Sequence, residues 1–348
     1  MKSFQELNYR AKILRLRKQA KAVLEAYDLA QASMKFLGYS GNTHYQVDTS
    51  QCAPPDPHDE RFWENHYILR LHQPKYQTFD AIRSELLWLQ AILQDTDLIV
   101  PEPVYNMKGE LVTVTEIPGL PSPQYATLLR WVKGRRTPKE IRDYHYKALG
   151  RVAGKLHDHS AHWQLPKGFT RIDYDWDGLF SDAGLFEISA SKLWEAIPIP
   201  YQEPFAIVTE QVRDVMNELG TGSDVYGLIH ADLCLDVNML WYRGEIRPID
   251  FDDSAYGYWI YDLAISLAEV EDDDTRHRFQ NALLEGYTEI RPMPASQWKH
   301  LDLFIGAWHA TAMLYAINAW LAQPKFREWS ERWRDQEGDY LIQTVARL

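Results

Sequence analysis

The chain has 348 residues, of which 45% are hydrophobic and 13% aromatic; this length favours two domains or lobes, and this composition excludes a globally disordered chain. Its 37 basic and 49 acidic side chains give a net charge of −12, which excludes the basic field of a general nucleic-acid-binding protein. Cys52 and Cys234 lack a metal-ligand spacing, and no apolar run approaches the roughly 18 residues of a membrane span, so we expect a cytoplasmic protein without a membrane partner.

The first predicted element is a helix in a basic segment. Residues 10–21 carry six basic side chains among apolar ones: Arg10, Lys12, Arg15, Arg17, Lys18 and Lys21. We favour a surface helix with a solvated basic face, and a helix that binds a membrane surface or a partner is the alternative. Residues 1–30 are therefore predicted to form an N-terminal helical extension.

Short strands and one helix are predicted for the next hundred residues. Ser40-Gly41-Asn42 is a small-residue turn between two strand-like runs, which predicts a β-hairpin. An apolar stripe that includes Ile82, Leu86 and Leu89 predicts a helix over 80–94. The predicted strands are residues 34–39, 43–48, 67–72 and roughly 110–117 and 125–131.

After Gly134 the pattern becomes mainly helical. A strand pair is predicted at about 238–242 and 245–250, joined through Arg243-Gly244, and helical patterns dominate from Tyr261 onward. A strand-rich first third and a helix-rich remainder suggest two lobes with a cleft between them, where ligands commonly bind. We expect an N-lobe at 31–133 and a C-lobe at 134–348.

The most informative stretch is Gly227-Leu-Ile-His-Ala-Asp-Leu-Cys-Leu-Asp-Val-Asn238, followed by Arg247-Pro-Ile-Asp-Phe-Asp-Asp253. An in-line phosphoryl transfer needs a carboxylate that orients the acceptor hydroxyl, which is the role we predict for Asp232. It also needs oxygen ligands for Mg²⁺ on the phosphates, which Asn238 and Asp250 can supply. These residues predict a kinase.

A second group of residues is expected to act on the nucleotide phosphates. Arg70 lies in a predicted strand opposite the helix that holds Glu85, and a cation held by a carboxylate is the usual kinase device for aligning phosphates. Arginine offers bidentate phosphate contacts where lysine would offer a point charge. The turn Ser40-Gly41-Asn42 could cover the phosphates with backbone N–H groups, although an ordinary hairpin turn looks the same.

Three further polar residues receive mainly structural interpretations. His230 is expected to orient the loop by hydrogen bonds, because a kinase needs no imidazole for proton transfer. For Asp262 we favour a helix N-cap, with bracing of the catalytic loop as the alternative. His157 is expected to be a structural histidine.

These motifs resemble the aminoglycoside phosphotransferase and choline kinase superfamily, whose members share a two-lobe protein-kinase-like fold. The residues that carry the resemblance are His230, Asp232, Asn238, Ile249-Asp250-Phe251 and Tyr261 to Ala264. The similarity runs from about residue 34 to 270. It implies an α+β fold with a small antiparallel-sheet N-lobe and a larger, mainly helical C-lobe. It also implies ATP or GTP as donor, with the backbone near Trp131 and Val132 holding the base.

The chain departs from the family pattern in the catalytic loop. Five residues separate Asp232 from Asn238, whereas the family usually has four. We favour a loop that bulges by one residue so that Asn238 still reaches the metal. The alternatives are that Asp236 takes over as ligand, or that metal binding is impaired.

The sequence therefore predicts a Mg²⁺-dependent kinase that phosphorylates a hydroxyl of a small molecule, in the manner of aminoglycoside, choline or homoserine kinases. Its expected partners are a nucleotide and the acceptor, with no nucleic acid and no membrane. One alternative is a stress-response-type Ser/Thr protein kinase, which would phosphorylate protein. Another is a nucleotide-binding pseudokinase, which the displaced Asn238 would favour.

Overall fold

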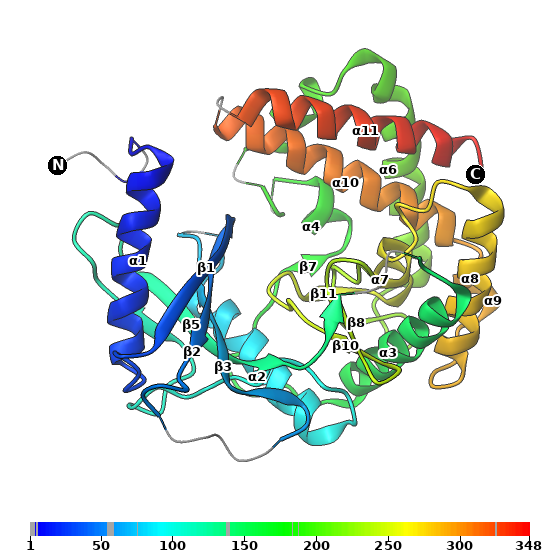
Figure 1. Ribbon diagram of the computed structural model, residues 1–348. Coiled ribbons are helices and arrows are strands. Elements are labelled where there is room, and N and C mark those ends of the chain that lie inside the picture. Colours follow the sequence, from blue (N-terminus) through cyan, green and yellow to red (C-terminus); the bar gives the residue numbers. More distant parts are fainter. Residues whose placement is uncertain are drawn as a thin grey trace. The chain divides into compact units, whose positions relative to one another are not determined.

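The computed structural model describes residues 4, 6–53, 59–74, 76–136, 140–182, 184–186, 188–323 and 326–348 (Figure 1). Their arrangement divides into two compact units. Unit 1 comprises the described residues of Met1–Arg135, Leu165–Thr170 and Leu240–Arg243. Unit 2 comprises those of Arg136–Gln164, Arg171–Met239 and Gly244–Leu348.

Unit 1 is built on a five-stranded antiparallel sheet. Its strand order is β1-β2-β3-β5-β4, and two helices, α1 (Tyr9–Glu25) and α2 (Phe79–Asp95), accompany it. The strands are β1 (Ser33–Ser40), β2 (Asn42–Asp48), β3 (Phe62–Leu71), β4 (Thr113–Thr115) and β5 (Gln124–Val132). The predicted hairpin is confirmed, because Ser40 pairs with Asn42 across Gly41.

The two helices use opposite faces of the sheet. Leu16 and Leu24 of α1 share a buried apolar cluster with Leu69 and Leu71 of β3, and Figure 1 shows α1 lying along the sheet. Successive side chains of a strand point to opposite faces, so Arg70 points away from this cluster and meets α2. The alternation of β3 therefore places one charged side chain on the α2 side of the sheet.

The N-terminal helix is confirmed, and its basic side chains are divided between two environments. Arg10, Arg17, Lys18 and Lys21 are exposed. Lys12 is buried with its Nζ 5.4 Å from the centre of the Phe4 ring, and Arg15 Nη1 donates to the carbonyl oxygen of Gly119 at 2.6 Å. Two of the six basic residues thus help to dock α1, and four face solvent.

Unit 2 is mainly helical, which confirms the predicted α+β fold. Its principal helices are α3 (Asp143–His162), α6 (Ile199–Leu219), α7 (Trp259–Ile265), α8 (Asp273–Thr288), α10 (Leu301–Ala322) and α11 (Arg327–Val345). Shorter helices are α4 (Trp176–Phe180), α5 (Ala190–Glu195) and α9 (Ala295–Trp298). None of the helices in the described part of the chain has the length and apolar content needed to cross a membrane.

Short strands flank the predicted catalytic segments. A three-stranded sheet has the order β7-β11-β8, formed by Asp173–Tyr174, Ala255–Tyr258 and Tyr226–Ile229. The strands β9 (Met239–Tyr242) and β10 (Glu245–Pro248) are joined by Arg243-Gly244, whose φ angles of 53° and 88° suit a tight hairpin turn. The remaining strand, β6, is Arg135–Arg136.

Helices α3 and α8 approach each other through two glycines. A Cβ atom on Gly150 would overlap the backbone carbonyl oxygen of Leu283, and one on Gly286 would overlap that of Lys147. Each glycine therefore lets one helix contact the backbone of the other. Because backbone atoms cannot move aside as a flexible side chain can, a methyl group at either position forces the helices apart.

Replacing Gly150 with alanine is expected to lower the free energy of unfolding by about 1–3 kcal/mol, the usual cost of overpacking. The control is Gly38→Ala in β1, where an added Cβ meets no atom within 4 Å. Urea denaturation of both variants measures the difference. Equal stability of the two variants would show that α3 and α8 are not in close backbone contact.

Candidate active site

The predicted catalytic loop follows β8 and folds back so that Asn238 contacts Asp232. The side-chain Nδ2 of Asn238 donates to Oδ2 of Asp232 at 2.6 Å and to the backbone oxygen of Asp232 at 3.0 Å. The backbone N–H of Asn238 donates to the carbonyl oxygen of Cys234 at 2.9 Å, which closes a turn over the intervening residues. In that turn Asp236 and Val237 are exposed, whereas Asn238 is 3% exposed.

This geometry accommodates the extra residue of the loop. The turn from Cys234 to Asn238 projects Asp236 and Val237 outward and returns Asn238 to Asp232. Because its Nδ2 faces Asp232, the amide Oδ1 of Asn238 lies on the opposite side of the amide group. This is the orientation in which an Asn can offer oxygen to a cation, so the bulged loop stays our preferred interpretation.

The residue before Asp250, Ile249, is hydrogen-bonded to the same loop. The N–H of Ile249 donates to the carbonyl oxygen of Asn238 at 2.9 Å, and Nε2 of His230 donates to the carbonyl oxygen of Ile249 at 3.0 Å. Asp250 has a φ of 66°, a left-handed conformation that a non-glycine residue holds only when its surroundings impose it. The hydrogen bond from His230 to Ile249 confirms the predicted role of His230 in orienting the loop.

Arg171, which belongs to none of the sequence motifs, supports the segment after Asp250. Its Nε donates to the carbonyl oxygen of Ser254 and its Nη2 to that of Asp252. Arg171 is 6% exposed; its bond to Ser254 is buried and its bond to Asp252 is partly buried. Arg171 lies 83 positions from Ser254 in the chain, and no local sequence pattern indicates such a pairing.

Asp262 is not a helix N-cap, so our preferred interpretation of it was wrong. The N-cap of α7 is Tyr258, and Asp262 lies within the helix with its carboxylate directed at the catalytic loop. Its Oδ2 accepts the backbone N–H of His230 at 3.0 Å and its Oδ1 that of Ala231 at 2.8 Å. Ala231 has a φ of 65°, so Asp262 holds a strained backbone in place and braces the loop before Asp232.

His157 completes this brace. Its Nε2–H donates to Oδ2 of Asp262 at 3.0 Å, and its Nδ1 lies 3.0 Å from the hydroxyl of Tyr287, which donates to it. The imidazole is completely buried, and burial lowers the pKa of His157 below its ordinary value of 6.5. The expected structural role is confirmed, with a neutral ring at neutral pH.

The lowered pKa of His157 predicts acid sensitivity. The unfolded chain binds a proton at pH values where the buried imidazole stays neutral, so stability rises with pH in that range. The free energy of unfolding should therefore decrease as the pH falls below about 6.5, the unfolded value. The His157→Gln variant should show a shallower pH dependence in urea titrations, although His145 and His300, whose pKa values burial also lowers, keep part of it. An unchanged slope would contradict the role of His157.

In unit 1 the predicted cation and carboxylate form a buried pair. Nη1 of Arg70 lies 2.8 Å from Oε1 and 3.0 Å from Oε2 of Glu85, and the two side chains are 4% and 1% exposed.

The turn at Gly41, where φ is 70°, is held by a side chain: Oδ1 of Asn42 accepts the backbone N–H of Gln73 at 2.9 Å. This bond ties the turn to the end of β3, the strand that carries Arg70.

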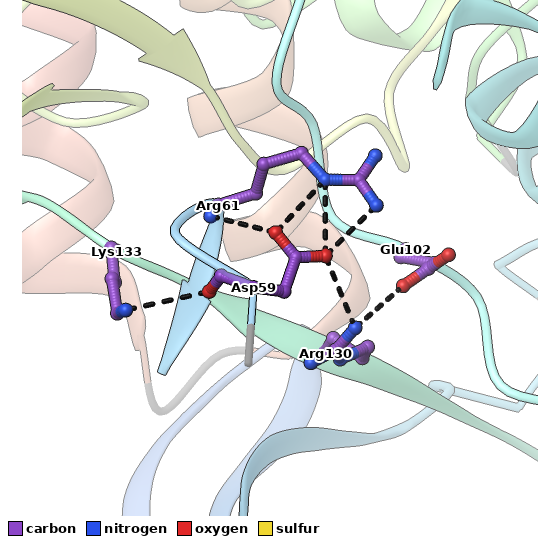
Figure 2. Close-up of polar contacts among 5 residues, drawn as sticks. All are labelled: Asp59, Arg61, Glu102, Arg130 and Lys133. Carbon is purple, nitrogen blue, oxygen red and sulfur yellow. Dashed lines mark hydrogen bonds and ion pairs between the residues drawn. The ribbon is translucent and has the colours of Figure 1, made fainter. Parts of the chain in front are cut away.

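The predicted hinge residues Trp131 and Val132 lie at the end of β5. Val132 pairs with Phe62 of β3. Figure 2 shows the charged cluster beside this strand end, in which the Asp59 carboxylate contacts both Arg61, at 2.9 Å, and Arg130, at 3.5 Å. These contacts fix the backbone of β5 just before the predicted hinge.

The predicted site residues thus fall into groups within the two units. Unit 2 brings Asp232, Asn238 and Asp250 together, and unit 1 brings Arg70 and Glu85 together. In the described ranges, no group of three or more His, Cys, Asp and Glu side chains is arranged to hold a metal ion. Asn238 and Asp250 nevertheless offer the hard oxygen donors that Mg²⁺ prefers, and this ion usually takes only one or two protein carboxylates besides phosphate and water.

A sequence profile of the phosphotransferase enzyme family matches residues 55–295, which is more than half of the chain. The chain belongs to this family. The predicted catalytic segment, from His230 to Asp262, lies inside the matched range. The predicted phosphotransferase activity toward small-molecule hydroxyl groups is therefore confirmed at the level of the family.

Individual relatives are about one quarter identical to this chain over the parts that match. The amicoumacin kinase of Bacillus subtilis (strain 168) is 26% identical over 59% of this chain and 57% of its own length, so the match spans less than two thirds of that protein. The homoserine kinase of Neisseria meningitidis serogroup B is 26% identical over 67% of the chain and 72% of its own length. A solved microcompartment-associated aminopropanol kinase is 26% identical, covers 95% of both chains and has a TM-score of 0.75.

These relatives are named as kinases of small molecules. The alternative of a stress-response protein kinase is therefore not favoured. The structural likeness over nearly the whole chain also confirms the predicted kinase-like fold.

Proposed function

We propose that this protein transfers the γ-phosphate of ATP or GTP, with Mg²⁺, to the hydroxyl group of an amino alcohol. The observation that carries the proposal is the mutual fixing of Asp232, Asn238 and the backbone before Asp250. Phosphoryl transfer depends mainly on positioning and on electrostatic stabilisation, so a prearranged set of this kind is what the reaction needs. Asp232 would accept the hydroxyl proton as the acceptor oxygen attacks the phosphorus.

Mg²⁺ would be held by Oδ1 of Asn238 and by the carboxylate of Asp250. The ion supplies charge neutralisation on the phosphate oxygens. Nδ2 of Asn238 is already bonded to Asp232, so one amide would link the base to the metal site. This arrangement favours Asn238 over the exposed Asp236 as ligand.

In unit 1, Arg70 would align the phosphates, with Glu85 fixing its guanidinium. Backbone N–H groups of the Ser40-Gly41-Asn42 turn would contact the phosphates, and the backbone near Trp131 and Val132 would hold the base. On this proposal residues 31–133 bind the nucleotide and residues 134–348 carry catalysis and acceptor binding. We also retain the cytoplasmic location as a prediction from the two widely spaced cysteines.

Acidic side chains beside Asp232 support a cationic acceptor. Partial desolvation and the carboxylates of Asp236, Glu337 and Asp232 all raise the pKa of Glu269, so these carboxylates share one region. Glu271, two residues after Glu269, lines a groove of about 530 Å³ together with Asp335, Asp339 and one basic side chain, Arg332. An ammonium group would relieve the repulsion among these carboxylates.

The same observation favours an aminopropanol-like acceptor over homoserine. Homoserine carries a carboxylate besides its amine, and that carboxylate would need a cation in the pocket. The pKa of Glu269 is shifted by desolvation and by carboxylates, and Arg332, the basic side chain in the described lining of the groove, is not among the groups that shift it. We therefore expect 1-amino-2-propanol to be a better acceptor than homoserine.

Nucleotide binding tests the metal site. Thermal shifts with ATP and GTP, with and without Mg²⁺, should show a Mg²⁺-dependent rise in melting temperature. Asp250→Ala and Asn238→Ala should lose that rise, whereas Asp236→Ala should keep it. Loss in Asp236→Ala with retention in Asn238→Ala would assign the metal to Asp236. Stabilisation of the wild-type protein by nucleotide that does not depend on Mg²⁺ would indicate a defective metal site and favour the nucleotide-binding pseudokinase.

A further inference from the structure

Cys234 contacts the proposed catalytic base directly. Its Sγ lies 3.1 Å from Oδ1 of Asp232, and the thiol donates to that oxygen. The cysteine is held by its backbone as well, because its N–H donates to the carbonyl oxygen of Asp232 at 2.8 Å and its carbonyl accepts from Asn238 at 2.9 Å. The direction of the thiol is therefore fixed by the same turn that returns Asn238 to the base.

A cysteine thiol is ordinarily protonated at neutral pH, since its usual pKa is about 8.5. A thiolate would repel the neighbouring carboxylates, whereas an S–H group can donate to one of them. Cys234 thus adds a hydrogen-bond donor beside the base without adding charge.

The two oxygens of Asp232 each have one donor. Oδ1 accepts from Cys234, and Oδ2 accepts from Asn238. Two donors on opposite oxygens fix the rotation of the carboxylate about its Cβ–Cγ bond. A carboxylate has about four lone-pair positions, so it keeps acceptor capacity for a substrate hydroxyl.

We propose that Cys234 is a positioning residue whose S–H group holds the Asp232 carboxylate in the orientation that accepts the proton of the acceptor hydroxyl. This inference rests on the proposed function of Asp232. In the transfer, the acceptor oxygen bonds to the γ-phosphorus, the bond to the β–γ bridging oxygen breaks and the hydroxyl proton moves to Asp232. The proton on sulfur stays in place throughout.

Kinetics of Cys234→Ala and Cys234→Ser provide the first test. A misdirected base lowers the rate of the chemical step, so kcat of Cys234→Ala should fall about ten- to a hundredfold with KM for nucleotide and acceptor unchanged. Cys234→Ser keeps a donor and should recover most of the activity. Wild-type kcat in the alanine variant, or a serine variant as slow as the alanine variant, would overturn the proposal.

A spectroscopic test does not depend on activity. The chain has two cysteines, and Cys52 is exposed, so a Cys52→Ser background leaves Cys234 as the source of the S–H stretching band in Raman spectra. We expect that band at the lowered frequency of a hydrogen-bonded thiol, and we expect Asp232→Ala to raise it. A band at the free-thiol frequency that Asp232→Ala leaves unmoved would refute the hydrogen bond.

Comparison with Asp232→Asn separates failure of this inference from failure of the proposed function. If Asp232→Asn keeps wild-type kcat, Asp232 is not the base, and both the proposed function of Asp232 and the role of Cys234 are contradicted. If Asp232→Asn is inactive while Cys234→Ala has the kcat and the melting temperature of the wild-type protein, only the proposed role of Cys234 is contradicted.

Discussion

Replacing Asp232 with asparagine is expected to lower kcat by about 100- to 10,000-fold, the usual contribution of a general base. The amide has nearly the shape of the carboxylate but cannot accept the proton of the acceptor hydroxyl. It also has only one acceptor oxygen, whereas the carboxylate receives hydrogen bonds from both Cys234 and Asn238. One of these two donors would therefore face an NH₂ group, which should loosen the loop as well.

The control for this prediction is Asp236→Asn. Asp236 is an exposed carboxylate in the same loop, so its replacement makes the same change of charge away from the base. We expect its kcat to stay within about threefold of wild type, because Asp236 does not take the proton, whereas its KM for a cationic acceptor should rise with the loss of one carboxylate of the acidic region. Full activity of Asp232→Asn, measured as release of ADP in the presence of acceptor, would contradict the mechanism.

Replacing Glu85 with alanine is expected to lower the free energy of unfolding by about 3–5 kcal/mol, the usual cost of removing one partner from a buried ion pair. The Arg70 side chain would then lie in the interior without the carboxylate that now contacts it at 2.8 Å. On the proposed function the KM for nucleotide should also rise, because the guanidinium loses the group that directs it. Urea denaturation and steady-state kinetics measure the two effects.

The matched control is Glu60→Ala, which removes the partner of an exposed arginine in the same unit. Nη1 of Arg243 lies 2.7 Å from Glu60, and the two side chains are 66% and 60% exposed. Exposed pairs contribute about 0–1 kcal/mol, so this variant should be nearly as stable as wild type. Similar losses in the two variants would show that the Arg70–Glu85 pair has no special stabilising role.

Local periodicity predicted much of the fold. The stripe of Ile82, Leu86 and Leu89 specified helix α2, and the small residues around Gly41 specified the first hairpin. Such signals depend on a few neighbouring residues, so they can be recognised without knowing the contacts of the rest of the chain. The catalytic loop was predictable for a related reason, since His230 and Asp232 lie two positions apart and their chemistry is distinctive.

Contacts between distant segments could not be predicted. Asp262 was expected to cap a helix because it precedes an apolar helical run, yet its carboxylate accepts backbone N–H groups 31 and 32 residues earlier in the chain. His157 reaches the same carboxylate across 105 residues. The Cys234 thiol is two residues from Asp232, but only the folded turn shows that it donates to the base. Without the tertiary structure, each of these residues has an ordinary local explanation.

The most direct measurement of the central claim is a phosphorus NMR assay with ATP, Mg²⁺ and 1-amino-2-propanol, run on the wild-type protein and on Asp232→Asn. We predict that the wild-type protein forms ADP and a new phosphomonoester signal in equal amounts, and that Asp232→Asn forms neither over the same period. A wild-type protein that binds Mg²⁺ and ATP but yields no phosphomonoester would contradict the proposed acceptor class. An equal yield from Asp232→Asn would contradict the role of Asp232.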